Sequence, residues 1–511
     1  MNRTFKVVFS KVRGTMVVAS EAAATPHKKA AKTVIAAAAA LAMGTAMAQE
    51  WVEVPTADDG ALILEQNKSV TAEDLQKYSK FVYTRYTETK DPGGFYGVSE
   101  GDSNIFDKQV WVTATGENTQ SHALHAYGTG VKLTNTGKIY IQAGEDAKPH
   151  SQKGMMAGGG ATVVNEGDIV AKKAYGMTVE TDKASRIENG VHGTITVLEQ
   201  GAGIELGGAS GSIAVNNGTI TASSEGSAAA DPWAHGVLIK APVSGNSYKF
   251  TNNGEITANG PGASAIEVQA GDEGKVTSAE IDLIEGSQID GVVRVNAGTK
   301  VTLNAKGTHD SFRLESSSEE LSLNVRDGAE ITLEDDDRTD NGALISSVVI
   351  DDGRLNASIW QQDNRFKDVT VNEDGIFNIK ALNSKTSDDL AENDRLLVAF
   401  GNNWTLNGGK LYVDRAERDD LKIKIGSAGD KGTGALTINS GNYSFGRVEL
   451  GSGEGNSLTI NGGTLTADTF NATNGTTTVS GGGVLASGNI EYTAGGNGKV
   501  KLSEGGTLRT S

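Results

Sequence analysis

Cysteine is absent from this chain of 511 residues, so no disulfide can hold its fold together. Proline occurs only seven times against 66 glycines, which argues against a proline-rich disordered linker and favours a fold with many turns at positive φ. Aromatic residues make up 5% of the chain and hydrophobic residues 37%, which indicates a thin, elongated core. Stability must then come from packing in that core and from backbone hydrogen bonds.

A long hydrophobic run is missing as well. The most apolar stretch, residues 33–47, is shorter and richer in alanine than the ~20 apolar residues that a membrane-spanning helix needs. It follows lysines at positions 28, 29 and 32 and ends in Ala46-Met47-Ala48, directly before Gln49. A basic segment, a short apolar segment and a small-residue site predict a cleavable secretory signal peptide in residues 25–48, cut between Ala48 and Gln49.

Residues 1–24 add a second basic region that an ordinary signal peptide does not have. Its distinctive parts are Met1-Asn2, Phe5–Val8, Lys11–Thr15 and Val17–Glu21. These residues resemble the extended signal peptide region of type V secreted proteins, which are bacterial autotransporters, trimeric autotransporter adhesins and two-partner exoproteins. The family usually has an aromatic residue, often tryptophan, at the positions of Phe9 and Met16, so position 16 is a mild departure.

This resemblance implies a Gram-negative source and export through the inner-membrane secretion machinery, with signal peptidase removing the leader. It also implies a final location at the cell surface, at the outer membrane or outside the cell. The lack of cysteine then has two explanations. A chain that crosses a second membrane unfolded must avoid cross-links made on the way, or a large repetitive fold needs no disulfides.

The exported part is strongly acidic. Residues 1–48 hold seven of the 46 basic residues and one of the 64 acidic residues, so their removal leaves a net charge of −24. Such a chain lacks the basic surface that contacts with nucleic-acid phosphates require. Repulsion from anionic lipids also argues against a peripheral membrane patch.

A phrase of the form apolar-x-Asn-x-Gly-x-Ile recurs through residues 121–300, followed in the C-terminal part by a variant close to Asn-Gly-Gly-x-Leu. Its apolar residues alternate with polar ones, which is typical of a half-buried strand. Its glycines are expected at corners, where they accept positive φ. These repeat-corner glycines are Gly137, Gly167, Gly193, Gly218, Gly254, Gly409, Gly441, Gly463, Gly483 and Gly506.

Such units could pair as antiparallel hairpins, but two features favour a parallel solenoid. The phrase recurs at intervals of one coil, and equivalent positions hold like residues, so the isoleucines would stack ~4.8 Å apart. These isoleucines are Ile139, Ile169, Ile195, Ile220 and Ile256. The units also resemble the passenger repeats of monomeric autotransporters, which implies an all-β, right-handed parallel β-helix.

We therefore expect four segments after the leader. They are an N-terminal cap (49–120), a β-helix with Asn-x-Gly-x-Ile repeats (121–300), irregular rungs with acidic loops (301–400) and a β-helix with Asn-Gly-Gly-x-Leu repeats (401–511). The chain stops inside a repeat phrase and has none of the aromatic-girdled strands of an outer-membrane barrel. We thus expect either truncation before a C-terminal barrel or a separate outer-membrane β-barrel translocator.

Candidate catalytic and metal-binding residues are few. Gly101-Asp102-Ser103-Asn104 resembles the start of a serine-protease motif but breaks it at Asn104, so Ser103 is expected in an ordinary turn. His122 and His125 are expected on opposite sides of a strand, at the surface. The acidic runs 334–337 and 351–352 lack calcium-loop spacing and are expected in solvated loops. No catalytic, metal or cofactor-binding residue is assigned, although carboxylates paired across rungs stay possible.

The sequence thus favours a non-catalytic, exported passenger that acts as an adhesin or surface-interaction protein towards an unknown host or bacterial ligand. A secreted β-helical enzyme, serine protease-like or carbohydrate-active, is the alternative. A two-partner secretion exoprotein is the second alternative.

Overall fold

The computed structural model divides the chain into two units, Met1–Gln49 and Glu50–Ser511. The structure describes residues 5–10, 15–20, 51–65, 70–85, 93–99, 103–115, 120–144, 151–224, 234–241, 245–271, 276–308, 312–318, 320–334, 345–360, 366–382, 397–400, 402–413, 422–426, 433–451, 455–492 and 496–510. In the first unit, β1 (Phe5–Ser10) and β2 (Thr15–Ser20) pair antiparallel, so that Phe5 faces Ser20.

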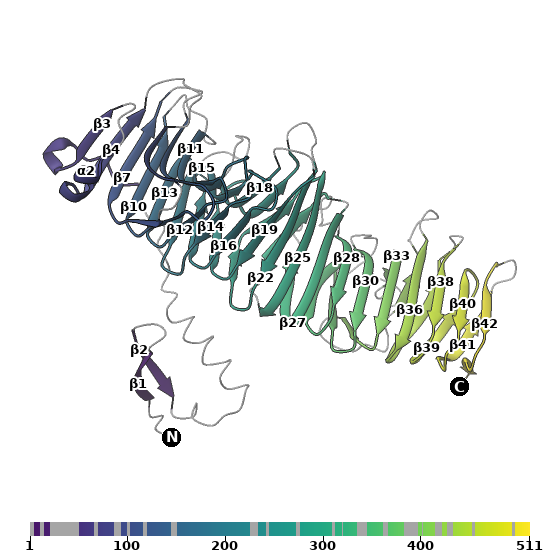
Figure 1. Cartoon of the computed structure of the whole chain (residues 1–511). Helices are drawn as coiled ribbons and strands as arrows, with labels where there is room; N and C mark the ends of the chain where they lie inside the picture. The colour runs from purple at the N-terminus through teal and green to yellow at the C-terminus, as the bar shows by residue number, and fades with distance from the viewer. Residues whose placement is uncertain are drawn as a thin grey trace. The chain divides into compact units, whose positions relative to one another are not determined.

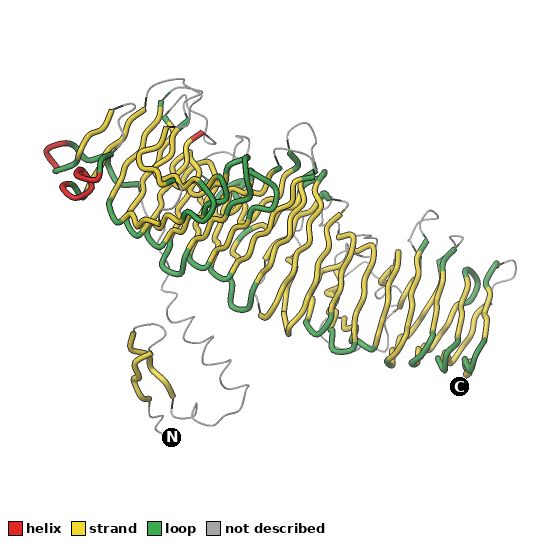
Figure 2. The backbone as a smooth tube through the Cα atoms, in the orientation of Figure 1, coloured by secondary structure: helices red, strands yellow, loops and turns green. Residues whose placement is uncertain are grey.

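The second unit is a parallel coil of short strands (Figure 1). Each turn of the chain places its strands beside those of the previous turn, which makes an all-β, parallel β-helix with stacks of parallel strands. In Figure 2 strands make up most of the coil, and loops form its corners. The first stack consists of β3 (Leu62–Glu65), β4 (Lys80–Arg85), β7 (Gln109–Ala114), β10 (Lys138–Ala143), β13 (Asp168–Val179), β15 (Thr194–Leu206), β17 (Thr219–Ser223), β20 (Glu255–Asn259) and β23 (Gln288–Asp290).

The second stack includes the later halves of β13, β15 and β27, because those long strands bend around a corner of the coil. Its other members are β5 (Gly93–Val98), β8 (Ser121–Tyr127), β11 (Gln152–Gly158), β18 (Ala234–Lys240), β21 (Ser264–Gln269), β24 (Val292–Val295), β26 (Phe312–Ser316), β29 (Arg354–Trp360), β31 (Ile376–Leu382) and β34 (Lys410–Val413).

The third stack has members throughout the coil. They are β6 (Ser103–Phe106), β9 (Lys132–Asn135), β12 (Thr162–Asn165), β14 (Arg186–Asn189), β16 (Ile213–Asn216), β19 (Asn246–Asn252), β22 (Thr277–Leu283), β25 (Thr299–Thr308), β27 (Glu320–Glu334), β28 (Ile345–Ile350), β30 (Phe366–Asn372), β33 (Asn402–Asn407), β36 (Gly434–Ser440), β38 (Ser457–Ile460), β40 (Thr476–Val479) and β42 (Lys499–Leu502). A separate six-stranded sheet contains β32 (Leu397–Phe400), β35 (Lys422–Ile425), β37 (Asn442–Leu450), β39 (Thr464–Asn471), β41 (Val484–Glu491) and β43 (Thr507–Thr510).

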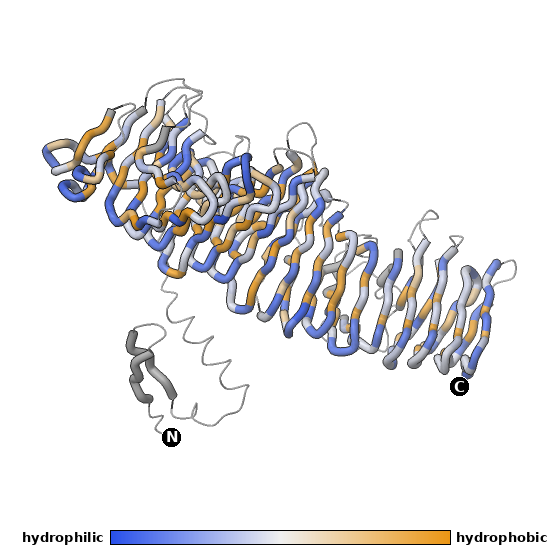
Figure 3. The backbone as a smooth tube through the Cα atoms, viewed as in Figure 1, coloured by the Kyte–Doolittle hydropathy of each residue, from blue (hydrophilic) through white to orange (hydrophobic). Residues whose placement is uncertain are grey.

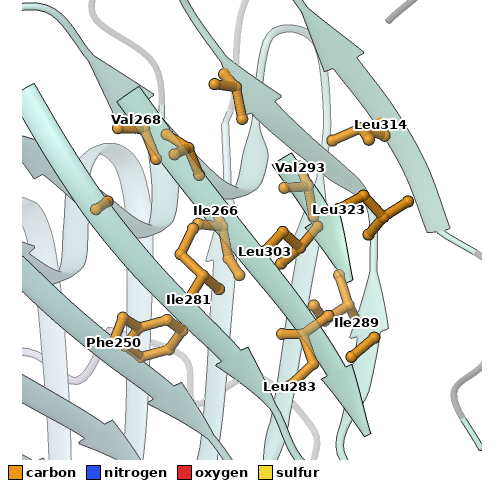
Figure 4. Close-up of a cluster of buried hydrophobic side chains, with 14 of the residues drawn as sticks. Phe250, Ile266, Val268, Ile281, Leu283, Ile289, Val293, Leu303, Leu314 and Leu323 are labelled. Carbon is orange, nitrogen blue, oxygen red and sulfur yellow. The ribbon is translucent and has the colours of Figure 1, made fainter. Parts of the chain in front are cut away.

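The core is a spine of like aliphatic residues, as the repeats predict. Ile139 pairs in register with Ile169, and the column continues through Ile195, Ile220 and Ile256, each at most 1% exposed. Hydrophobic and hydrophilic residues alternate along many strands of the coil in Figure 3, so one side of these strands faces the interior. Farther along the coil, Phe250, Ile281, Leu303 and Leu323 continue the interior (Figure 4).

The repeat asparagines form a second buried column, at the corner between the third and first stacks. From Asn135 to Asn216, each Nδ2 donates to the Oδ1 of the next asparagine over 2.8 to 2.9 Å, and all five residues of the column are fully buried. Most of them also donate to the backbone carbonyl of the corner glycine, as Asn165 does to Gly167 over 3.1 Å. This buried ladder consists of Asn135, Asn165, Asn189, Asn216 and Asn252.

The reason for the corner glycines differs from the one the sequence suggests. Only Gly441 and Gly463 among the ten have a positive φ. At the other eight, a Cβ atom would lie under 3.0 Å from the backbone of a neighbouring rung, which no real contact allows. The explanation through positive φ is therefore wrong for these eight, because close stacking of rungs excludes any side chain there.

Two other segments add detail to the expected organisation. Within the expected N-terminal cap, a short helix, α2 (Ala72–Lys77), precedes β4, and Thr71 is its N-cap, accepting from the Asp74 backbone over 3.1 Å. A single-turn 3₁₀ helix, η2 (Ala57–Asp59), precedes them. Within residues 301–400, expected as irregular rungs with acidic loops, the structure describes β26, β27, β28, β30 and β31 as rungs of the coil. The segment boundaries at residues 120, 300 and 400 stay predictions.

Candidate functional site

The expected signal-peptidase residues Ala46, Ala48 and Gln49 lie outside the described residues. The nearest described segment begins at Trp51, which would stand close to the start of the cleaved chain. Trp51 packs edge-on against Tyr140, with ring centroids 6.0 Å apart, and Trp111 Nε1 donates to the Val52 carbonyl over 3.4 Å. Trp51 and Val52 are thus held against the outside of the coil.

The surface beneath Trp51 is an apolar column on the outer side of the first stack. Trp111 stacks on Tyr140 with ring centroids 4.8 Å apart, and Val82 and Val170 extend the column on either side. All four side chains are at most 5% exposed. The repeat phrases do not predict this column, although Trp111 and Tyr140 occupy the same place in successive rungs.

A charged network lies on the outer side of the second stack, on β18, β21, β24 and β26. Glu267 is 2% exposed and its Oε2 lies 3.0 Å from Arg294 Nη1 and 3.3 Å from His235 Nδ1. Gln269 and Asn296 donate to its other oxygen over 2.7 and 3.0 Å. Burial would raise the pKa of Glu267, but His235, Gln269 and Arg294 outweigh burial and hold that pKa below its usual value.

Ser264 joins this network and gives it the composition of a serine, histidine and carboxylate triad. The geometry does not match one. His235 Nδ1 faces both the Ser264 hydroxyl, over 2.7 Å, and Glu267, whereas a catalytic histidine uses one nitrogen for each partner. Ser264 is also fully buried, so its oxygen is not presented to a substrate. The network is therefore built to compensate buried charge, with Arg294 extending it to Glu315 over 2.9 Å.

The N-terminal residues of the chain match a known protein family. Residues 1–49 match the family described as Extended Signal Peptide of Type V secretion system. This is a type V secretion leader. The coil that follows it is the exported passenger, and export crosses the inner membrane by a route that includes an outer-membrane translocator. No curated protein and no solved structure matches the chain.

His122 and His125 of the passenger differ from expectation. His122 is 3% exposed rather than at the surface, and its ring lies 4.8 Å from that of His125, so the two do not face opposite sides. His125 Nε2 lies 3.3 Å from Glu180 Oε1. The alternation rule fails here because β8 does not alternate between buried and exposed residues: its first four residues, 121–124, are all buried.

Glu205 on β15 is a carboxyl whose pKa is strongly raised. Burial raises its pKa to about 7, and the positive charges of Lys153 and Lys240 only partly oppose this. It lies between Thr178 and Leu238 in the register of the second stack. The Thr178 hydroxyl is buried without a hydrogen-bond partner among the described residues. A carboxyl that keeps its proton near neutral pH can act as a hydrogen-bond donor or a general acid.

The remaining candidates stay isolated. Ser103 begins β6 as an exposed residue that faces Lys132 in register, so it lies in a strand rather than the expected turn. Asp351 pairs with Arg326 over 3.1 Å and accepts from Asn372, which makes it part of the coil. Within the described ranges, no group of three or more histidines, aspartates or glutamates could hold a metal ion. None of the helices described there is long and apolar enough to cross a membrane.

A polar surface on the outer side of the third stack completes the passenger's candidates. Five threonines follow one another in register from β30 to β40, each between buried core residues. Beside them, asparagine side chains bond to one another along the stack over 2.8 to 3.0 Å. We call these the threonine row (Thr370, Thr405, Thr437, Thr459, Thr478) and the asparagine row (Asn372, Asn407, Asn439, Asn461). The recurring order apolar-Thr-apolar-Asn could have shown both rows in advance.

Proposed function

We propose that the passenger acts at the bacterial surface or outside the cell as an adhesin or surface-interaction protein. Its leader is of the type V kind, and its body is a coil whose strands offer long rows of identical, outward side chains. The observation that best supports the proposal is the combination of a type V leader with rows of identical outward side chains. A stack of equivalent rungs can contact an extended partner at many points.

The partners implied are the inner-membrane secretion machinery, signal peptidase, an outer-membrane translocator and a ligand on a host or bacterial surface. The strongly acidic chain keeps the passenger soluble and discourages non-specific association, which suits a protein that selects its partner by shape and hydrogen bonds.

Surface display and adhesion are tested together on producing cells. Intact cells that make the whole gene product are probed with an antibody against residues 49–511 and treated with external protease, and their attachment to host matrix and epithelial cells is counted. Cells whose Ala46 and Ala48 are both replaced by arginine serve as the control with a blocked signal-peptidase site. Antibody labelling without any attachment advantage over cells lacking the gene would refute the adhesin.

A secreted β-helical enzyme is the second candidate, and Glu205 is the observation that favours it. A partly buried carboxyl with a pKa of about 7 has the property required of a general acid in glycoside cleavage. Purified residues 49–511 would then release reducing sugars from polysaccharides, and Glu205→Gln would abolish this while Ser103→Ala would not. Loss through Ser103→Ala alone would instead indicate a serine hydrolase.

A further inference from the structure

The threonine row presents hydroxyl groups at regular intervals. Thr405, Thr437 and Thr459 alternate along their strands with buried residues such as Leu406, Ile438 and Ile460, so their side chains point out of the coil. Parallel neighbours stand ~4.8 Å apart in a sheet, and the row repeats at this interval from rung to rung. All five threonines are partly exposed.

These hydroxyls are unused within the part of the passenger that the structure describes. None of the five threonines makes a side-chain hydrogen bond to any described residue, whereas the neighbouring asparagines bond along their own row. A hydroxyl can donate one hydrogen bond and accept two, and an asparagine amide in such a row keeps a second N–H and a lone pair. The two rows together therefore form a flat array of free donors and acceptors.

The same array carries no charge along four successive strands. β33, β36, β38 and β40 contain no aspartate, glutamate, lysine or arginine, although the chain after the leader has a net charge of −24. Charged residues lie on the strands at its two ends. Asp368 of β30 pairs in register with Asn403 of β33, and Lys501 of β42 pairs in register with Thr478 of β40. The side chains of these four strands therefore offer no carboxylate to attract a cationic ligand and no cation to form an ion pair with an anionic one.

We propose that the threonine and asparagine rows bind a neutral, hydroxyl-rich polysaccharide that lies along the stack of rungs. This inference rests on the proposed surface-interaction function and names its ligand class. A sugar chain supplies uncharged hydroxyls that match the free groups of the array, and its repeating units can engage successive rungs, so that weak individual hydrogen bonds add up. An anionic glycan would meet no cation on these strands and would be repelled by the rest of the passenger.

The test uses purified residues 49–511 and immobilised amylose and galactomannan as neutral probes, with heparin and alginate as anionic ones. The variant Thr437→Val with Thr459→Val keeps the shape of the row and removes two hydroxyls, so we expect it to bind the neutral probes about tenfold more weakly. The matched control is Thr221→Val with Thr257→Val, two outward threonines in register on the first stack, which should bind like the parent. Hydrogen exchange of both variants checks that the rungs remain folded.

The outcomes separate this proposal from the broader one. Neutral-probe binding lost only in the row variant supports the polysaccharide site. Equal loss in the control, preference for heparin or alginate, or concentration-dependent dimerisation removed by the row variant would each overturn it, the last in favour of a second copy of the chain on this face. Cell attachment that persists without neutral-probe binding would overturn the polysaccharide site and leave the adhesin standing. Absence of both cell attachment and neutral-probe binding would refute the polysaccharide site and the adhesin together.

Discussion

In residues 121–300 the repeat asparagines are fully buried and bond to one another inside a corner of the coil, whereas Asn439 and Asn461 of the later row are exposed on its outside. The outer sides differ in the same sense. Some outward groups of the earlier rungs are covered or compensated, as with Trp111 under Trp51 and Glu267 beside Arg294, while the later rungs carry a continuous row of partly exposed threonines.

The difference in burial shows that the repeat asparagine serves two different purposes in the two regions. A buried amide must find its partner in the adjacent rung, so the early ladder fixes the register of each turn on the next. An exposed amide can exchange its partner for water, so the later row adds little to register and stays available to an external molecule. The early rungs are thus suited to holding the coil together, and the later rungs to contacting a partner.

The largest contrast is expected between two asparagine substitutions. Asn189→Ala removes a fully buried side chain and leaves the amides of Asn165 and Asn216 each without one partner, at a cost of about 3–5 kcal/mol of local stability. Asn439→Ala, in the exposed row, should cost less than about 1 kcal/mol because water replaces the lost bonds. Hydrogen exchange of the flanking strands measures both, and equal costs would erase the distinction between the two halves.

Arginine substitutions give the next largest contrast. Arg294→Met leaves the nearly buried Glu267 without its arginine partner, and we expect a loss of about 2–4 kcal/mol around β21 and β24. Arg447→Met is the matched change in the later rungs, where Glu449 and Glu491 keep more access to water. That variant should lose less than about 1 kcal/mol in urea denaturation followed by hydrogen exchange. A larger loss at Arg447 would reverse the comparison.

Much of the fold could be predicted from the sequence because one residue type recurs at one coil length. The isoleucines of the Asn-x-Gly-x-Ile phrase stack as their spacing requires, and the leader was recognisable from the extension in residues 1–24 and the signal peptide that follows it. The role of the asparagines was hidden, because a sequence shows that Asn165 and Asn189 recur but not that their side chains meet. The corner glycines were found for the wrong reason, since positive φ and close approach of backbones both require glycine.

The candidate sites were less predictable, since each is assembled across rungs. His235, Ser264, Glu267 and Arg294 come from three strands with 27 to 32 residues between some partners, and no local motif joins them. The threonine row is the exception, because every member sits at the same place in its phrase. Cross-rung register can therefore be inferred where a phrase repeats faithfully, and it cannot where the repeat degenerates.

The pH dependence of local stability provides a third contrast, between β15, which carries Glu205, and β38. Its pKa in the folded chain is about 7, above the ordinary 4.5, so the folded state keeps a proton that the unfolded state releases. The resulting penalty is absent below pH 4.5, grows as the pH rises to 7 and reaches at most about 3 kcal/mol above that. Glu205→Gln should therefore stabilise β15 at pH 8 and leave it nearly unchanged at pH 4.5. Hydrogen exchange corrected for intrinsic rates measures this, with β38 as the internal reference that should not respond, and a variant equally affected at both pH values would contradict a raised pKa.

The smallest contrast concerns two glycines that the sequence does not distinguish. At Gly218 a Cβ atom would press into the backbone of the preceding rung, so Gly218→Ala should force two rungs apart and cost about 1–3 kcal/mol. Gly482 has a φ of 82° and nothing within 4 Å of an added Cβ, so Gly482→Ala meets only the strain of a left-handed residue, partly offset by a less flexible unfolded chain, at about 1 kcal/mol or less. The test that separates sterics from φ is substitution by asparagine, which tolerates the left-handed region. Gly482→Asn should recover most of the lost stability, whereas Gly218→Asn should be worse than alanine because a longer side chain meets the same backbone.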